Sequence, residues 1–289
     1  MYKCVGMNKK ELKILEELNS DRGLFNEQNS DFFPEYKVIS YPMQLLLLRK
    51  IKLLKRNFDY VGYSWFTTQN RNRIRLNSLF VNADKDQLEG FNALITPLKK
   101  KPYINYFCTR NSYNFEILQE LGFEKKNGNF EMLRQNLYFN SLDLDKDISF
   151  QLFKKAEDEE LRCFIQNEIF KNSNRIPLTV ADIYFDQLQN YYLPKGSIFI
   201  KYKNQYIGYG QIIIDEGKPT IVNFGILPNY RNKGFGKIFL DYLLNLVKEE
   251  GYASTSIKVR ADNEVALKLY SSHDFKKVKE TYNFELSRR

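Results

Sequence analysis

Hydrophobic residues in the C-terminal half follow two periods that distinguish strands from helices. Alternation at 198–202 and at 206–214, on either side of a polar tripeptide, predicts a β-hairpin. Apolar residues recur every three or four positions over 235–250, which predicts a helix closed by Gly251. Shorter patterns add strands at 149–154, 220–227, 254–259 and 276–286, and helices at 156–171, 180–191 and 263–272. The resulting order, β-α-α-β-β-β-α-β-α-β, predicts a mixed α/β fold.

The same pattern predicts details within two of these helices. Thr179 stands directly before the helix at 180–191 and is of a residue type that caps helix N-termini. In the helix at 156–171, apolar positions three and four residues apart predict one inward face. This face comprises Leu161, Phe164, Ile165 and Ile169.

The N-terminal half resembles the C-terminal half. The segment 206–209 matches 60–63, and further along the chain Gly236 corresponds to Gly90. A repeat of about half the chain is too long for a solenoid and implies two copies of one domain. We therefore predict two tandem α/β domains, 1–140 and 141–289, each a mostly antiparallel mixed sheet flanked by helices.

The composition is that of a globular protein with an anionic partner or a basic surface. Hydrophobic residues make up 43% of the chain, and the low glycine and proline counts argue against disorder. The net charge of +9 suits a nucleotide cofactor, nucleic acid or an acidic surface. The basic residues are dispersed and no helix-turn-helix or aromatic RNA-binding motif is present, so the sequence does not favour nucleic acid.

Few residues suit metal or triad chemistry. Cys4, Cys108 and Cys163 form no CxxC pair, and His273 is the single histidine, so we expect no metal site and no Ser/His/Asp triad. An odd cysteine number and an N-terminus without an apolar signal core predict a cytoplasmic protein. The longest apolar run, 45–48, is far shorter than the about 20 residues of a spanning helix. We therefore expect no membrane association.

The most informative segment is 222–275, where a strand leads through the turn 231–236 into a helix. Backbone N–H groups at a helix N-terminus lack partners, and the helix dipole favours negative charge there. The turn therefore suits a pyrophosphate. A P-loop would require glycine at Arg231 and serine or threonine at Ile238, and the G-x-G-x-x-G pattern would require glycine at Phe239.

Arg231-x-x-Gly234-x-Gly236, followed by Asn263-x-x-Ala266-x-x-Leu269-Tyr270 one strand later, resembles the signature of the GNAT superfamily of acetyl-CoA-dependent N-acetyltransferases. The order of elements extends the resemblance over 148–289. It implies two tandem GNAT-like domains and an acyltransferase without a metal. The donor would be acetyl-CoA, and the acceptor an amine of a small molecule or a peptide.

The resemblance also implies a role for each motif residue. The strand end at Ile226 and Leu227 would pair with the pantetheine arm, and the turn amides would hold the pyrophosphate. Asn263 would hydrogen-bond the arm near its thiol, and Tyr270 would protonate the departing thiolate as the catalytic acid. The implied cofactor-binding residues are Ile226, Leu227, Arg231, Asn232, Lys233, Gly234, Phe235, Gly236, Lys237 and Asn263.

Each of these residues also has a purely structural interpretation. The two glycines suit an ordinary turn, where one of them would supply an unusual dihedral angle. Asn263 suits a helix N-cap, and Tyr270 suits the core face of an amphipathic helix. Arg231 and Lys233 suit a solvated surface.

The C-terminal copy departs from the GNAT pattern where many members carry a catalytic base. Lys258 stands at one glutamate position and Thr220 near the other, so the sequence assigns no general base. Deprotonation relayed by water, or an amine that binds neutral, stays open. Asp274 replaces the glycine before Phe275, which we attribute to a left-handed turn that tolerates aspartate.

The N-terminal copy departs further. Its counterpart of the glycine turn is 85–90, where Leu88 replaces the first glycine and both Asp86 and Glu89 would repel phosphate. Pro97 interrupts the following helix. Asn111 is retained, whereas Leu118 replaces the tyrosine. We predict that this copy has lost cofactor binding and serves as a scaffold or shapes the acceptor cleft.

Three functions therefore remain open. The first is an acetyltransferase that uses the C-terminal copy alone. The second is a tandem aminoacyl-transferase that takes its donor from charged tRNA, although such enzymes tend to lack an intact CoA turn. The third is a pseudoenzyme that binds CoA without catalysis, which the missing base suggests. Neither the acceptor nor the oligomeric state follows from the sequence.

Overall fold

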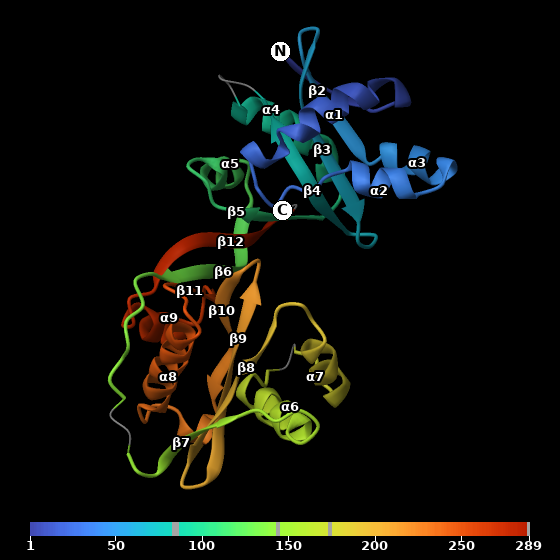
Figure 1. The fold of residues 1–289 in the computed structure, drawn as a ribbon. Coiled ribbons are helices and arrows are strands. Elements are labelled where there is room, and N and C mark those ends of the chain that lie inside the picture. Colours follow the sequence, from blue (N-terminus) through green and yellow to red (C-terminus); the bar gives the residue numbers. More distant parts are fainter. Residues whose placement is uncertain (83–86, 143–144, 173–174, 288–289) are drawn as a thin grey trace. The chain divides into compact units, whose positions relative to one another are not determined.

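A computed structural model of the chain describes residues 1–82, 87–142, 145–172 and 175–287. The chain forms two compact units (Figure 1). The first unit comprises Met1–Asn129 with Lys279–Arg289, and the second comprises Phe130–Val278.

The second unit follows the predicted order of elements, so the predicted fold class is confirmed. Its sheet runs β11-β10-β9-β8-β7, antiparallel throughout except for the parallel pair of β10 and β11. The elements are β7 (Ile148–Leu152), α6 (Glu159–Ile169), α7 (Val180–Gln187), β8 (Tyr192–Tyr202), β9 (Gln205–Asp215), β10 (Lys218–Ile226), α8 (Phe235–Glu249), β11 (Thr255–Arg260) and α9 (Glu264–Ser271). The strand β12 (Lys276–Ser287) begins here.

The strand β10 separates from β11 halfway along its length. The two strands pair only at Thr220–Ser256 and Ile221–Ile257, although β10 continues to Ile226. A bulge between Val222 and Gly225 interrupts the pairing of β10 with β9 on the opposite side. Asn223, within the bulge, has φ 53°, in the left-handed region. Such a bulge bends the strand, and the end of β10 is left unpaired on the β11 side.

The helices of the second unit confirm one detail of the sequence pattern and correct another. Thr179 caps α7 through a capping box with Asp182, as predicted. The predicted inward face of α6 is wrong at Phe164, which is 62% exposed. Instead, α6 buries the polar side chains of Arg162 and Gln166. Arg162 donates to Gln166 within α6, and also to one residue on α7 and one on β9, which offsets the cost of burial.

The first unit has the same order of elements, with an additional helix. Its sheet runs β1-β2-β3-β4-β5-β12. As predicted, Pro97 interrupts the helix. The α-helix α4 ends at Ile95, and a 3-10 helix that contains Pro97 begins at Thr96. The elements are β1 (Tyr2–Gly6), α1 (Leu12–Ser20), α2 (Phe33–Val38), α3 (Tyr41–Leu48), β2 (Ile51–Arg56), β3 (Asp59–Thr68), β4 (Arg73–Val81), α4 (Gln87–Ile95), β5 (Tyr103–Thr109), α5 (Asn114–Glu120) and β6 (Glu124–Arg134).

Each unit contains the final strand of the other copy of the repeat. In the first unit, β12 pairs antiparallel with β5 from Thr281–Thr109 to Ser287–Tyr103. In the second unit, the end of β6 lies next to β11 in the strand order. The predicted boundary at 140/141 concerns the repeated sequence, whereas each compact unit combines residues of both copies.

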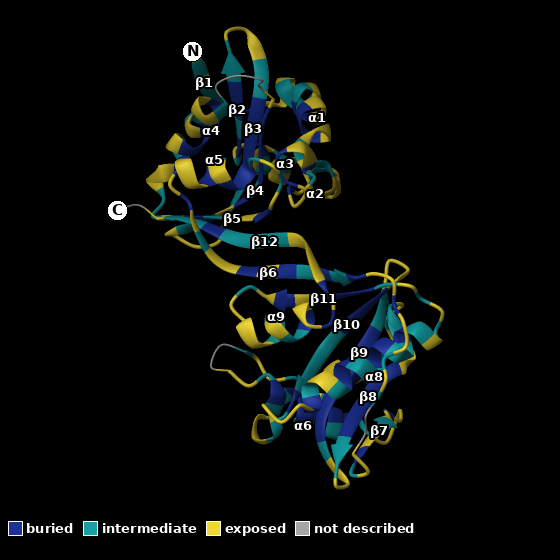
Figure 2. Cartoon of the chain, turned by 90° about the vertical axis from the view of Figure 1, so that its left-hand side faces the viewer, coloured by how far each residue is buried: buried dark blue, intermediate teal, exposed yellow. Residues whose placement is uncertain are grey.

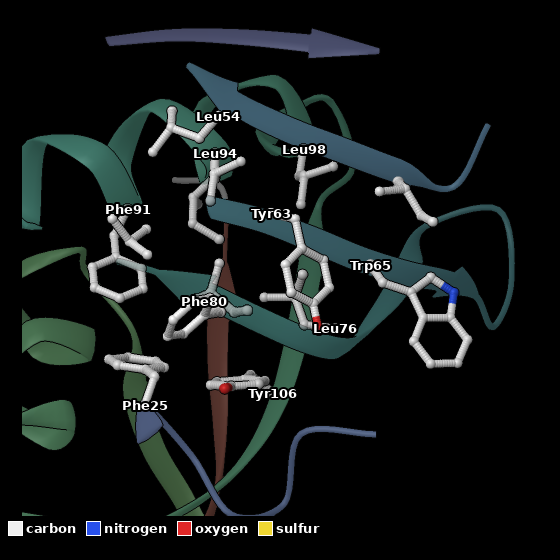
Figure 3. Close-up of a cluster of buried hydrophobic side chains, with 14 of the residues drawn as sticks. Phe25, Leu54, Tyr63, Trp65, Leu76, Phe80, Phe91, Leu94, Leu98 and Tyr106 are labelled. Atoms are coloured by element: carbon white, nitrogen blue, oxygen red, sulfur yellow. The ribbon is translucent and has the colours of Figure 1, made fainter. Parts of the chain in front are cut away.

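The hydrophobic cores lie along the strands, which are mostly buried, while the helices expose their outer faces (Figure 2). In the first unit the core includes Tyr63, Trp65, Phe80 and Phe91 (Figure 3). Phe284 of β12 is fully buried in the same cluster. The exchanged strand is therefore part of the core of the first unit.

Candidate active site

The turn between β10 and α8 presents a row of free backbone amides. A 3-10 turn at Pro228–Tyr230 leads into it, and both Asn232 (φ 62°) and Gly234 (φ 85°) are left-handed. The N–H groups of residues 232–236 donate to no acceptor among the described residues. Lys237 N is the first amide of the series that is satisfied, by Gly234 O at 3.0 Å. Alternating left-handed residues form a concave nest of N–H groups, which suits an anion.

The two glycines of the turn serve different purposes. Gly234 has a positive φ, which residues with a Cβ rarely adopt. Gly236 lies in the first turn of α8, and a Cβ there would meet only Leu269 Cδ2, at an ordinary 3.7 Å. The fold therefore favours glycine at 234 but gives no reason for it at 236. A ligand bound close to the backbone of the turn would explain why residue 236 is glycine.

Arg231 joins three elements through backbone carbonyls. Its Nε donates to Ile226 O at 2.9 Å, and its Nη2 donates to Ile169 O at 2.7 Å. The guanidinium thus ties the end of β10 and the end of α6 to the turn. These contacts are structural, in addition to the positive charge that Arg231 places at the nest.

The other residues of the predicted cofactor-binding set differ in how many of their polar groups are available to a ligand. Leu227 N donates to Ile207 O on β9, and the side chain of Phe235 is buried. Lys233 and Lys237 are exposed beside the nest, and Lys233 Nζ lies 5.7 Å from the ring centre of Tyr230. The turn therefore offers a row of amides with two exposed cations beside it.

Asn263 and Tyr270 lie at the two ends of α9. Asn263 caps the helix, its Oδ1 accepting from Ala266 N at 3.2 Å. Tyr270 is 6% exposed, and its ring lies 6.3 Å from that of Phe224 in the β10 bulge. The Tyr270 hydroxyl has no hydrogen-bond partner among the described residues. Its oxygen is not completely shielded from solvent. Burial raises the pKa of Tyr270, so the phenol stays protonated at neutral pH.

A buried polar network links α6 and α7 to the β10 bulge. Arg162 Nη2 donates to Asp186 Oδ2 at 2.6 Å and to Gln211 Oε1 at 3.0 Å. Gln211 Oε1 also accepts from Asn223 Nδ2 at 3.1 Å, and Asp186 Oδ1 accepts from Tyr191 at 3.0 Å. Sequence reasoning missed this network, because its members are far apart along the chain and belong to four elements.

The positions where the family often carries a base hold none. Thr220 is buried against Ser256, with 2.9 Å between the two hydroxyl oxygens, and Lys258 pairs with Asp215 at 3.7 Å on the surface. The carboxylate of Asp186 is linked to the bulge by hydrogen bonds through Gln211, which also accepts from Asn223. Asp274 has φ 61°, which confirms its predicted left-handed turn.

Within the residues that the structure describes, no group of three His, Cys, Asp or Glu side chains could hold a metal ion. No helix among them combines the length and the apolar character needed to cross a membrane.

Residues 153–275 match the sequence model of the Acetyltransferase (GNAT) family. A [ribosomal protein bS18]-alanine N-acetyltransferase of Escherichia coli K12 is 34% identical over 65 residues, which is 22% of this chain and 43% of that protein. The enzyme of the same name from Haemophilus influenzae is 38% identical over 77 residues, 26% and 51% of the two chains. The match thus spans about half the length of these relatives.

Solved structures resemble nearly the whole chain. A GCN5-related N-acetyltransferase from Sphaerobacter thermophilus has a TM-score of 0.60 at 11% identity and covers 99% of this chain and 95% of its own. A tandem GNAT protein from the clavulanic acid biosynthesis pathway has a TM-score of 0.54 at 9% identity and covers 99% and 98%. At this identity the likeness concerns the fold. Residues 153–275 thus match the GNAT family model, and over its length the chain has the fold of these tandem GNAT structures.

Proposed function

We propose that the second unit is an N-acetyltransferase that takes its acetyl group from acetyl-CoA and passes it to an amine. The observation that carries this proposal is the row of unsatisfied amides at 232–236, at the N-terminus of a helix of 15 residues. The diphosphate of acetyl-CoA is an anion of suitable chemistry for that nest. The room left by Gly236, which the fold does not need, supports a ligand that approaches the backbone closely.

The unpaired side of β10 would accept the pantetheine arm. Since β10 and β11 pair only up to Ile221, the following backbone has hydrogen-bonding capacity for an extended partner. Arg231 holds this strand end at a fixed distance from the nest through Ile226 O. The same donor would thus be bound by its arm and by its diphosphate.

Transfer requires a new C–N bond to the amine and cleavage of the C–S bond of the thioester. Tyr270 would donate its phenolic proton to the sulfur that leaves, and its position on α9, with its ring near Phe224 of the bulge and its hydroxyl without a described partner, supports this role. The amine loses its proton to solvent, since neither usual base position carries a carboxylate. Tyr270 is then reprotonated from solvent.

The acceptor is proposed to be an amine of a peptide or a small molecule. The curated relatives act on an alanine of a ribosomal protein, which supports a peptide amine as the first acceptor to test. Exposed apolar side chains on α6 and α7 suit an acceptor with apolar groups beside its amine. They are Phe164, Tyr184 and Phe185.

Calorimetric titration with acetyl-CoA tests the proposal. We expect one binding site in the wild type and a loss of affinity of at least about tenfold in Gly236→Val. Gly6→Val is the matched control, because Gly6 is exposed and a Cβ there would meet nothing within 4 Å. Equal affinity in wild type and Gly236→Val would contradict the proposed site. Release of free thiol with peptide amines then distinguishes an enzyme from a pseudoenzyme.

A further inference from the structure

The first unit contains a counterpart of the strand separation in the second. The strands β4 and β5 pair in parallel only from Arg73–Tyr103 to Leu76–Tyr106, although β4 continues to Val81 and β5 to Thr109. The register of β4 with β3 shifts beside Asn77, the counterpart of Asn223 in the repeat. We call the space between the separated ends of β4 and β5 the first-unit slot.

The loop between α1 and α2 occupies one side of this slot. Asn29 pairs with both backbone groups of Leu79 on β4: its Nδ2 donates to Leu79 O at 2.9 Å and its Oδ1 accepts from Leu79 N at 3.1 Å. One residue later, Ser30 N donates to Asn77 O at 2.8 Å. The loop thus hydrogen-bonds to β4 beyond the point where β5 leaves it, as an added strand would.

The same loop also satisfies the edge of β5. Asn26 Nδ2 donates to Phe107 O at 2.9 Å, and Asn26 Oδ1 accepts from Thr109 N at 3.1 Å. The turn is held together by Asn29 N, which donates to Asn26 O at 2.9 Å. Two side-chain amides in one short segment therefore serve both separated strands.

The retained asparagine of the N-terminal copy is used by the loop as well. Asn111 Nδ2 donates to Phe25 O at 3.0 Å, and Asn114 Nδ2 donates to the same oxygen at 2.8 Å. Asn111 is the counterpart of Asn263 in the second unit. There the Nδ2 of Asn263 has no partner among the described residues.

Burial makes the loop a fixed part of the core. Phe25 is fully buried and Asn26 is 1% exposed, while Asn29 is 5% exposed. The Phe25 ring centre lies 4.3 Å from that of Phe91, and Figure 3 shows Phe25 beside Phe91 and Tyr106. Removing the loop would leave unsatisfied amides and carbonyls on two strands in an apolar interior.

We propose that the segment 24–30 permanently occupies the first-unit slot. There the side-chain amides of Asn26 and Asn29 make the hydrogen bonds that the amides of a pantetheine arm would otherwise make. Acetyl-CoA is excluded from this unit, and the chain binds a single molecule of it. The stoichiometry rests on the function proposed for the second unit. The occupancy of the slot does not, because it concerns the protein alone.

Hydrogen exchange of the full chain, with and without acetyl-CoA, tests this. Without ligand, the Leu79 and Thr109 amides, which donate to Asn29 and Asn26, are expected to exchange at least about 1,000-fold more slowly than in the unfolded chain. Addition of acetyl-CoA should leave both rates unchanged and should slow the amides of the turn at 232–236. Fast exchange of Leu79 and Thr109 without ligand, or slowing on addition of acetyl-CoA, would overturn the proposal.

The other outcomes separate the two proposals. Slow exchange at Leu79 and Thr109 together with no response at 232–236 would support the occupied slot and contradict the proposed function. Calorimetric binding of two molecules per chain would overturn the occupied slot. In Asn29→Ala the Leu79 amide should exchange at least about tenfold faster, whereas the exposed control Gln28→Ala should not change it. If Asn29→Ala does not fold, the wild-type exchange rates decide.

Discussion

At Gly236, the effect of a substitution on stability can be distinguished from its effect on ligand binding. Its Cβ-free backbone is not required sterically, and alanine is favoured over glycine in a helix by up to about 1 kcal/mol. Gly236→Ala should therefore keep or raise the melting temperature while it weakens binding of acetyl-CoA by about tenfold. Thermal denaturation and calorimetry measure the two effects. An unchanged affinity would mean that no group of acetyl-CoA lies over this residue.

Tyr270 allows a test of catalysis with little effect on folding. Its hydroxyl makes no hydrogen bond with a described residue, so Tyr270→Phe should change the free energy of unfolding by less than about 1 kcal/mol. Loss of a general acid should lower kcat by about 100-fold or more. Steady-state rates with a peptide amine measure this. Full activity in Tyr270→Phe would remove the role assigned to the phenol.

The pH dependence follows from the same residue. Because burial raises the pKa of Tyr270, its neutral form is favoured in the folded state. Its contribution to stability is present below the unfolded pKa of about 10 and is lost as the pH rises above it. The rate of the wild type should thus show no alkaline loss from Tyr270 below about pH 10. An alkaline decline near neutrality that Tyr270→Phe abolishes would contradict this.

Sequence reasoning at the scale of residues succeeded where chemistry is local. The left-handed Gly234 and Asp274 follow from residue type and position, and so does the cap at Thr179. The carbonyl contacts of Arg231 did not follow, because Ile169 is distant in sequence. The signature thus predicts the turn but not the side-chain contacts that brace it.

At the scale of elements, Gly225 sets the approach of α6 to β10. A Cβ at this position would overlap Ile169 Cγ2. Gly225→Ala should therefore destabilise the second unit by about 1–3 kcal/mol through overpacking. In the double variant with Ile169→Ala the loss should be smaller than the sum of the two single losses. Denaturant titration gives the four values, and strict additivity would contradict direct contact.

The order of elements was predictable because strand and helix periods are local properties. The burial of α6 was not, since Arg162 looks like a surface residue until Asp186 and Gln211 are brought to it by α7 and β9. Burial of a polar residue costs less free energy where hydrogen-bond partners meet it. Those partners are supplied by tertiary structure, which explains the wrong assignment of Phe164.

At the scale of the molecule, the exchanged strand makes the first unit depend on the end of the chain. Phe284 of β12 is fully buried, and its ring centre lies 4.8 Å from that of Phe115. Phe284→Ala should destabilise the first unit by about 3–5 kcal/mol. Val278→Ala, at an exposed position of the same strand, is the control. Hydrogen exchange of β5 amides measures the effect, and slow exchange that persists in Phe284→Ala would contradict it.

The repeat in the sequence predicts two copies of one fold but not which sheet receives each final strand. The alternation in 276–286 is the same whether the strand pairs within its own copy or with β5. Nor does the sequence show that Asn29 completes β4 and Asn26 completes β5, because those contacts span about 50 and about 80 residues along the chain. Long-range pairing is the part that periodicity leaves undetermined.

We propose that the chain has one diphosphate site, at the turn before α8. A crystal structure of the full chain with acetyl-CoA would locate this site. We expect diphosphate oxygens within about 3.2 Å of N–H groups between Asn232 and Gly236, with the segment 24–30 still in the first unit. Acetyl-CoA bound between β4 and β5, or away from residues 232–236, would contradict it.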